Sequence, residues 1–154
     1  MNDLDHLALA VEQAKSSVEQ GGFPAGAILV KDGKIVARGV SIGAQLHDPT
    51  SHGEMATIRA SCKELDSASL TGAILYTSME PCLMCFCAAY WADVTKIVYG
   101  CRRTPEMITN GYYQGKTELA AVNTENNREI KLEFRPEYEN DVRKIIQDWA
   151  VGVD

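Results

Sequence analysis

Two short segments of the sequence hold residue types that could do chemistry together: His52-Gly53-Glu54 and Pro81-Cys82-Leu83-Met84-Cys85. Between them they supply one imidazole, two thiols and one carboxylate. One nitrogen and two sulfur ligands suit a catalytic zinc site, in which three protein ligands leave the fourth position to water. The carboxylate of Glu54 is then free to move protons. We therefore predict one zinc ion per chain, bound by His52, Cys82 and Cys85, with Glu54 as the catalytic acid and base.

The spacing of the two cysteines predicts how they are held. Residues three apart lie on the same face of a helix, so both sulfurs can bind one ion. We expect a helix from Pro81, at the N1 position, to about Ala92. Cys82 and Cys85 then lie in its first turn, where the partial positive charge of the helix N-terminus lowers the cysteine pKa and favours the metal-binding thiolate.

The histidine and the carboxylate open a second predicted helix, from His52 to about Leu65, with Ser51 as its cap. Glu54 is two positions from His52 and can reach water at the metal without binding the metal itself. A C-x-x-C pair alone is more often a structural zinc half-site or a redox pair. Together, the H-x-E pattern and the cysteine pair favour a catalytic zinc over a structural one.

We assign no chemistry to the other histidines and cysteines near these segments. Cys87 is expected to be a buried thiol that points away from the ligand face, and His47 to be a loop histidine. His6 is expected to be exposed on the first helix. Tyr112-Tyr113 is flanked by glycines, which indicates a loop at the mouth of the site or in a subunit contact.

Composition limits the class of protein. The chain of 154 residues is expected to form a single domain, 1–154, and its 45% hydrophobic and 23% charged residues are ordinary for a soluble protein. No apolar run approaches the roughly 20 residues that cross a bilayer, and the acidic start lacks a signal peptide. Five cysteines, an odd number, favour free thiols. We therefore expect a cytoplasmic protein without a membrane partner.

The net charge of −6 argues against a nucleic-acid partner, because proteins that bind phosphates usually carry a basic surface. Arg102-Arg103 is the only adjacent pair of arginines, and the other basic residues are scattered along the chain. A small neutral substrate fits this balance better.

The order of the elements predicts an α/β fold. An amphipathic helix over 4–19 ends at Gly21-Gly22, and Asp32-Gly33 predicts a hairpin between strands at 27–30 and 35–37. We expect further strands at 73–77, 96–99 and 129–134, a loop at 39–50, a closing helix at 137–150, and irregular structure at 102–127 with a short helix near 116–122. This order predicts a three-layer α/β/α sandwich around a mixed five-stranded sheet, with the first two strands antiparallel.

The sequence resembles the cytidine deaminase superfamily, in particular its small bacterial and fungal nucleobase deaminases and its tRNA adenosine deaminases. The likeness covers about residues 21–104. The segments most similar to bacterial guanine deaminases are Tyr76-Thr77-Ser78-Met79-Glu80-Pro81-Cys82 and Ala88-Ala89-Tyr90-Trp91-Ala92. Those most similar to fungal cytosine deaminase are Gly21-Gly22-Phe23-Pro24 and His52-Gly53-Glu54.

The resemblance implies the same zinc ligands, Glu54 as acid and base, and a contact between the Gly53 N–H and the substrate base. It also implies a cytidine deaminase-like fold and a homo-oligomer, most simply a dimer. In the implied reaction, Glu54 takes a proton from water, protonates a ring nitrogen as water attacks the amidine carbon, and carries a proton to the leaving amine. The products are a carbonyl compound and ammonia.

Two departures from the family pattern predict a roomier pocket. Ser41 stands where the family commonly has an asparagine that reads the substrate, and a hydroxyl offers fewer hydrogen bonds than an amide. Ala25 stands where a larger apolar residue is common. The candidate substrate-binding residues are Phe23, Ala25, Ser41, Gly53 and Trp149. Trp149 is expected either to stack on a base or to pack against the first helix or the sheet.

Three hypotheses for the function follow. The leading one is zinc-dependent hydrolytic deamination of a free nucleobase or small nucleoside, of guanine or cytosine type, or of a related aminated heterocycle. The second is deamination of the wobble adenosine of tRNA, which needs a basic surface around the pocket. The third is a zinc-stabilised binding module without catalysis, against which the presence of Glu54 argues.

Overall fold

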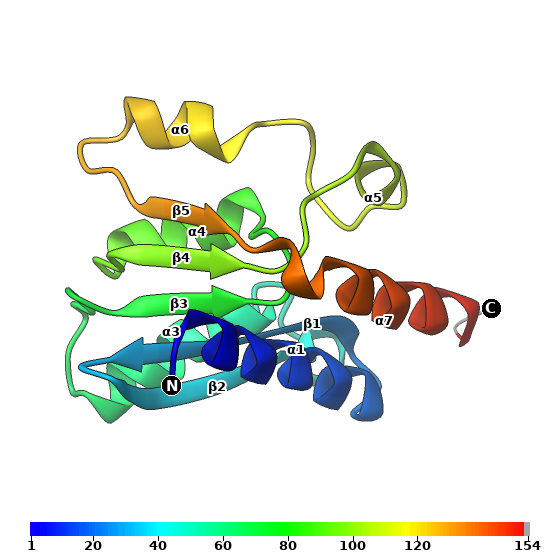
Figure 1. Cartoon of the computed structure of the whole chain (residues 1–154), viewed down its shortest axis with the longest axis horizontal. Coiled ribbons are helices and arrows are strands. Elements are labelled where there is room, and N and C mark those ends of the chain that lie inside the picture. Colours follow the sequence, from blue (N-terminus) through cyan, green and yellow to red (C-terminus); the bar gives the residue numbers. More distant parts are fainter. Residues whose placement is uncertain (153–154) are drawn as a thin grey trace.

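The computed structural model describes residues 1–152 and has a mixed five-stranded sheet with helices on both faces (Figure 1). The strands are β1 (Phe23–Lys31), β2 (Lys34–Ser41), β3 (Ile74–Thr77), β4 (Lys96–Tyr99) and β5 (Lys131–Phe134). The helices are α1 (Asp3–Glu19), α2 (Gly43–Leu46), α3 (Gly53–Glu64), α4 (Leu83–Trp91), α5 (Pro105–Thr109), α6 (Leu119–Glu125) and α7 (Glu139–Gly152), with a 3-10 turn at Pro136–Tyr138. The predicted three-layer α/β/α architecture is confirmed.

The strand order in the sheet is β2-β1-β3-β4-β5. β1 pairs antiparallel with both β2 and β3, whereas β3, β4 and β5 are parallel to one another. The hairpin between β1 and β2 turns at Asp32 and Gly33, whose φ angles are 52° and 74°. A type I′ turn requires positive φ at both central residues, so the Asp-Gly pair explains this connection.

Neighbouring residues of the central strands face opposite layers, as the two-residue period of a strand requires. On β1, Ala27 and Leu29 belong to the core on the side of α3 and α4. Ile28 and Val30 belong to the core on the side of α1. In Figure 1, α1 lies in front of the sheet, and α3 and α4 lie behind it. The continuous apolar run of β1 is therefore the signature of a strand that is buried on both faces.

Helix α1 packs closely against β1. A Cβ atom at Gly26 would overlap the backbone of Gln13, so only glycine fits there without a shift of the helix. His6 lies one turn before Ala10 on the same face of α1 and is buried, 5% exposed, with its ring centroid 5.0 Å from that of Tyr76. The expectation that His6 is exposed is wrong, because its position in the helix turns it toward the sheet.

The candidate site residues gather at one end of the sheet. β1 begins at this end, β2, β3 and β4 finish there, and α3 and α4 begin there (Figure 1). Phe23 and Ser41 are partners in the β1–β2 register at this end. Ligands of open α/β sheets bind in the crevice beyond the carboxyl ends of the strands, and the fold provides such a crevice here.

The starts of the two site helices differ from the prediction by one or two residues. Cys82 is the N-cap of α4, so Pro81 precedes the cap and does not occupy the N1 position. His52, rather than Ser51, is the N-cap of α3. Neither cap residue accepts a side-chain hydrogen bond from the helix, which leaves the imidazole and the thiol available for another partner.

Two segments expected to lack regular structure contain helices. The loop predicted at 39–50 begins with the end of β2 and includes α2. The segment 102–127 holds α6, which begins three residues after the helix expected near 116–122, and also α5, which was not expected. The start of helix α5 has a signal in the sequence, a threonine N-cap followed by a proline. Oγ1 of Thr104 accepts a hydrogen bond from the Met107 N–H at 3.2 Å, and Pro105 follows the cap. Within residues 1–152, no helix is long and apolar enough to cross a membrane.

Candidate active site

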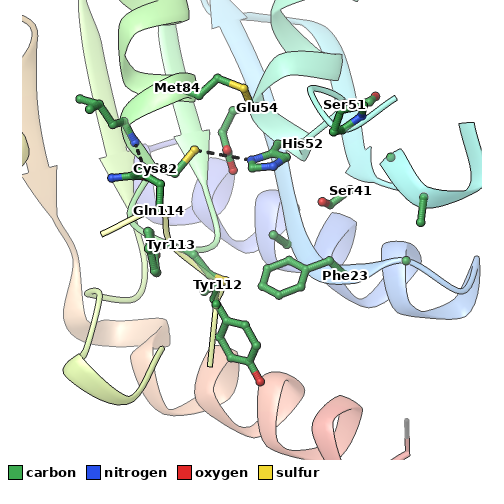
Figure 2. Close-up of a pocket in the computed structure, with 18 of the residues that line it drawn as sticks. Phe23, Ser41, Ser51, His52, Glu54, Cys82, Met84, Tyr112, Tyr113 and Gln114 are labelled. Carbon is green, nitrogen blue, oxygen red and sulfur yellow. Dashed lines mark hydrogen bonds between the residues drawn. The ribbon is translucent and has the colours of Figure 1, made fainter. Parts of the chain in front are cut away.

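The three predicted zinc ligands lie together at the N-terminal ends of α3 and α4. Nδ1 of His52 is 3.5 Å from Sγ of Cys82 (Figure 2). It is 3.6 Å from Sγ of Cys85, and the candidate ligand atoms of the group all lie within 4.8 Å of one another. One imidazole nitrogen and two sulfurs form a donor set that suits zinc. The residues therefore fit the predicted metal and leave a coordination position open for water or substrate.

The electrostatics of this group favour a thiolate at Cys82 and not at Cys85, since the hydrogen bond between the two residues and burial raise the pKa of Cys85. The predicted lowering of the cysteine pKa is therefore found for Cys82 and is wrong for Cys85. The hydrogen bond from Cys85, together with the neighbouring His52, lowers the pKa of Cys82 to about 4. The hydrogen bond to Cys82 in turn raises the pKa of His52. The thiolate is the form of cysteine that binds a metal, so Cys82 is prepared for this role before any ion arrives.

Glu54 is buried beside the ligand group. Its side chain comes from the first turn of α3, and the residue is only 5% exposed. Figure 2 shows its carboxylate between Cys82 and His52. Burial raises the pKa of Glu54 to about 7, because the charged form loses its water. A carboxyl group whose pKa lies near neutrality can both accept and donate a proton, as a general acid and base must.

A cavity of about 930 Å³ opens next to these residues and is lined by His52, Glu54 and Cys82 at its inner end. Four of the five predicted substrate-binding residues also line it: Phe23, Ala25, Ser41 and Trp149. Figure 2 shows the Ser41 hydroxyl directed toward the space between His52 and Phe23.

Gly53 is the exception among the predicted substrate-binding residues. It does not line the cavity and is buried against β1, where a Cβ at this position would lie 3.1 Å from Cα of Gly26. Its neighbours His52 and Glu54 do line the cavity. A side chain here would press on β1, so the close approach favours a glycine. A contact between its N–H and a base stays a prediction.

Three aromatic side chains from distant parts of the chain meet at the cavity. The ring centroid of Phe23 lies 5.3 Å from that of Tyr112 and 5.1 Å from that of Trp149, and the last two are 5.7 Å apart. All three contacts are edge-to-face, the arrangement that aromatic pairs prefer. Trp149 therefore packs on other aromatic residues, and Tyr112 belongs to the cavity wall.

Ser17 anchors two of the cavity residues and was not recognised in the sequence. This serine of α1 is fully buried, and its Oγ donates to the carbonyl oxygen of Phe23 at 2.6 Å and accepts from the N–H of Ser41 at 3.0 Å. It thereby holds the start of β1 against the end of β2. Its signal in the sequence is a polar residue on the apolar face of α1, one turn after Ala14.

The comparisons with known proteins agree with this geometry. A family model described as the cytidine and deoxycytidylate deaminase zinc-binding region matches residues 1–101, and the chain belongs to this family. Guanine deaminase of Bacillus subtilis (strain 168) is 44% identical over 105 residues, which cover 68% of this chain and 67% of the relative. A tRNA-specific adenosine deaminase of Aquifex aeolicus (strain VF5) is 38% identical over 93 residues, which cover 60% of this chain and 62% of the relative, less than two thirds of its length.

One similar solved structure comes from a study of A-to-I editing by tRNA:A34 deaminases at the wobble position of transfer RNA. Its TM-score to this chain is 0.79, at 28% sequence identity. The match covers 92% of this chain and 99% of that chain.

The chain is therefore a zinc-dependent hydrolytic deaminase with the cytidine deaminase-like fold. A non-catalytic zinc module is not supported. Relatives act on guanine and on tRNA, so likeness alone does not name the substrate.

Proposed function

We propose that the protein deaminates a free nucleobase or a small nucleoside, of guanine or cytosine type, or a related aminated heterocycle, and releases ammonia. The observation that carries this proposal is the buried carboxyl group of Glu54, which lies beside a three-residue metal group and opens on a cavity of about 930 Å³. That volume lies toward the upper end of what small-molecule sites occupy, so it suits a bicyclic base or a nucleoside.

In this proposal, His52, Cys82 and Cys85 hold the zinc ion. Zinc bound there supplies Lewis acidity and activates water for attack. Glu54 receives one proton of the attacking water and passes it to the ring nitrogen next to the reacting carbon. It then takes the proton of the added hydroxyl group and delivers it to the amine, so that the carbon–nitrogen bond breaks, ammonia leaves and a carbonyl group forms. Phe23, Ala25, Ser41 and Trp149 contact the heterocycle, and Ser41 can donate or accept a single hydrogen bond at its edge.

The charge of the cavity supports an unphosphorylated substrate. No lysine or arginine is among the residues of the described chain, 1–152, that line it, and its two ionisable carboxyl groups are Glu54 and Glu80. A phosphate group in such a cavity would have no lysine or arginine to pair with. A free base or nucleoside needs no such partner.

Deamination of the wobble adenosine in tRNA is the second candidate. It is favoured by the 38% identity to the Aquifex aeolicus enzyme and by the likeness to the tRNA:A34 deaminase structure. The net charge of −6 and the absence of a basic residue from the described cavity lining weigh against it. A substrate RNA would have to find its phosphate partners outside the cavity.

We further propose that two copies of the chain associate through the outer face of α4. All nine residues of this helix, Leu-Met-Cys-Phe-Cys-Ala-Ala-Tyr-Trp, are apolar or aromatic, and such a helix is normally buried on all sides. Trp91 is nevertheless 80% exposed. Leu83, Met84 and Cys87 of the same helix line the cavity, so a second copy on this face would also border the substrate site.

We also propose that the protein works in the cytoplasm. The five cysteines are free, which suits the reducing conditions there.

The function is tested by measuring ammonia release from zinc-loaded protein. Guanine, cytosine, adenine, their nucleosides, pterins and triazines are supplied one at a time, and an anticodon stem-loop RNA is assayed in parallel for inosine. We expect turnover of at least one free base or nucleoside and none of the RNA. Inosine formation without release of ammonia from any small molecule would instead establish the tRNA reaction.

A further inference from the structure

Arg103 lies outside the cavity, and its guanidinium group binds the segment that forms one cavity wall. The side chain is 8% exposed. Nη1 donates to the carbonyl oxygens of Gly115 at 3.0 Å and Thr117 at 2.8 Å. Nη2 donates to the carbonyl oxygen of Lys116 at 3.2 Å and to the carboxylate of Glu118 at 2.8 Å. One side chain therefore binds four successive residues.

The bound segment has no regular secondary structure to hold it. Residues 111–118 form neither helix nor strand, so their carbonyl groups have no place in a backbone ladder. The other cavity walls come from the start of β1 and the end of β2, from α2 and the loop after it, from the first turns of α3 and α4, from the loop after β3 and from α7. Arginine suits the task, because its five N–H donors project in a fixed planar fork. The position of this wall thus depends in large part on the side chain of Arg103.

Two further hydrogen bonds connect the same segment to the metal end of the cavity. Oη of Tyr113 donates to the carbonyl oxygen of Glu80 at 2.7 Å, and the N–H of Leu83 donates to Oε1 of Gln114 at 3.3 Å. Leu83 is the first residue of α4, directly after the metal-group residue Cys82. The segment is therefore bound by Arg103 on one side and by the loop that carries the metal group on the other.

Tyr112 belongs to this segment and lies in the cavity wall, so the position of the segment determines where the Tyr112 ring lies. Its ring contacts both Phe23 and Trp149 and lines the cavity next to Tyr113. The guanidinium of Arg103 lies 5.9 Å from the centroid of the buried Tyr113 ring. A shift of the segment would move the two tyrosines and change the width of the cavity without moving His52 or Glu54.

We propose that Arg103 is a positioning residue that fixes the cavity wall formed by Tyr112 and Tyr113 and thereby sets how tightly the substrate binds. Arg103 does not touch the reacting atoms, so it should affect binding far more than the chemical step. The inference rests on the proposed function only in taking a base or nucleoside as the substrate.

The kinetic test compares Arg103→Leu and Arg103→Lys with Arg128→Leu in the zinc-loaded full chain. Arg128 is a matched control, because it donates to the carbonyl oxygens of Tyr90 and Val94, both at 2.8 Å, and does not line the cavity. We expect Arg103→Leu to raise KM for the best base or nucleoside by about tenfold and to lower kcat by less than about threefold. Arg103→Lys should give an intermediate KM, because one ammonium group cannot bind three carbonyls.

A second measurement needs no substrate. Hydrogen exchange should lose protection across 111–118 in Arg103→Leu and keep it in Arg128→Leu, with zinc content at the parent level in both. In a Trp91→Phe background, Trp149 is the only tryptophan and contacts Tyr112, so its quenching by acrylamide should rise in Arg103→Leu. If no base or nucleoside is turned over, the proposed function fails while these two readouts still decide the role of Arg103.

The proposal is overturned if exchange across 111–118 is unchanged in Arg103→Leu, or if kcat and kcat/KM fall by the same factor. Loss of zinc from a folded Arg103→Leu would also overturn it, since Arg103 would then act on the metal group. If Arg103→Leu does not fold, Tyr113→Phe removes only the hydrogen bond to Glu80 and should show the same pattern at smaller amplitude. An unchanged KM and unchanged exchange in Tyr113→Phe would count against the proposal.

Discussion

Sγ of Cys82 lies 3.5 Å from Nδ1 of His52, and each residue is the N-cap of its helix with nearly the same backbone conformation. The φ and ψ angles are −69° and 162° at His52 and −72° and 169° at Cys82. Two helices that begin at the same end of the sheet thus present their first side chains to one point. Cys85, one turn into α4, completes the group from the same face.

Loss of Cys85 should therefore abolish zinc binding. In Cys85→Ala, only one thiolate and one imidazole remain, which is too few for a stable zinc site. Metal analysis after dialysis should show occupancy near zero, whereas Cys87→Ala, which removes a cavity-lining thiol outside the metal group, should stay fully loaded. Full occupancy in Cys85→Ala would remove this residue from the site.

Replacing Glu54 should separate proton transfer from metal binding. Glu54→Gln keeps the shape of the side chain but cannot accept a proton, so zinc content should equal that of the parent. We expect kcat to fall by at least about 100-fold, the low end for a general acid and base. Ammonia release and metal content are measured on the same preparation. A variant as active as the parent would rule out the proton transfer proposed for Glu54.

Ser17 should matter to both stability and substrate binding. Ser17→Ala leaves the N–H of Ser41 and the carbonyl oxygen of Phe23 without their partner, which costs about 1–3 kcal/mol of unfolding free energy. KM should rise, because both residues line the cavity. The control is Ser16→Ala, whose Oγ only accepts a hydrogen bond from Gln20 at the surface, and it should change stability by less than about 0.5 kcal/mol. Equal effects of the two substitutions would contradict the anchoring role.

The metal group and the layers of the fold could be predicted because their signals are local. Cys82 and Cys85 are one turn apart, and the apolar run of β1 and the Asp32-Gly33 turn are read directly from neighbouring residues. The same holds for the general position of α3 and α4. One missed element, α5, also had a local signal in its Thr104 cap and the following proline.

Ser17 and Arg103 could not be predicted, because their roles depend on contacts between distant segments. Ser17 meets Phe23 and Ser41 only after α1 folds onto the sheet. The carbonyl partners of Arg103 lie in a segment whose sequence has no hydrophobic periodicity, so its conformation could not be predicted. For His6, a shift of one position around the helix separates burial from exposure, and histidine is a residue of intermediate burial that favours neither.

The ion pair between α1 and the sheet should make stability depend on acid pH. Asp3 accepts hydrogen bonds from Tyr76 at 2.6 Å and from Lys96 at 2.9 Å, and these bonds lower its pKa from the usual 3.8. Because the pKa of Asp3 is lower in the folded state than in the unfolded state, its ionised carboxylate stabilises the protein at pH values above the unfolded-state pKa. This contribution to the free energy of unfolding is lost as the pH falls through the folded-state pKa. Asp3→Asn should therefore cost about 1–2 kcal/mol at pH ~7 and clearly less at pH ~3, measured by urea unfolding. Glu12→Gln, at an exposed ion pair, should cost less than about 0.5 kcal/mol at either pH.

A charge on the outer face of α4 should prevent the proposed association of two chains. Trp91→Lys places an ammonium group where the side chain is 80% exposed on a helix without polar residues, and burial of that charge between two copies would be costly. Light scattering after size exclusion should give twice the chain mass of 16.9 kDa for the parent and the single mass for the variant. Leu65→Lys, at another exposed apolar position beyond the end of α3, should remain dimeric. Because Met84 and Cys87 belong both to α4 and to the cavity lining, the monomeric variant should also show a raised KM with unchanged zinc content.

A parent protein that elutes at the mass of one chain, or a Trp91→Lys variant that keeps the double mass, would show that this face of α4 does not bind a second copy.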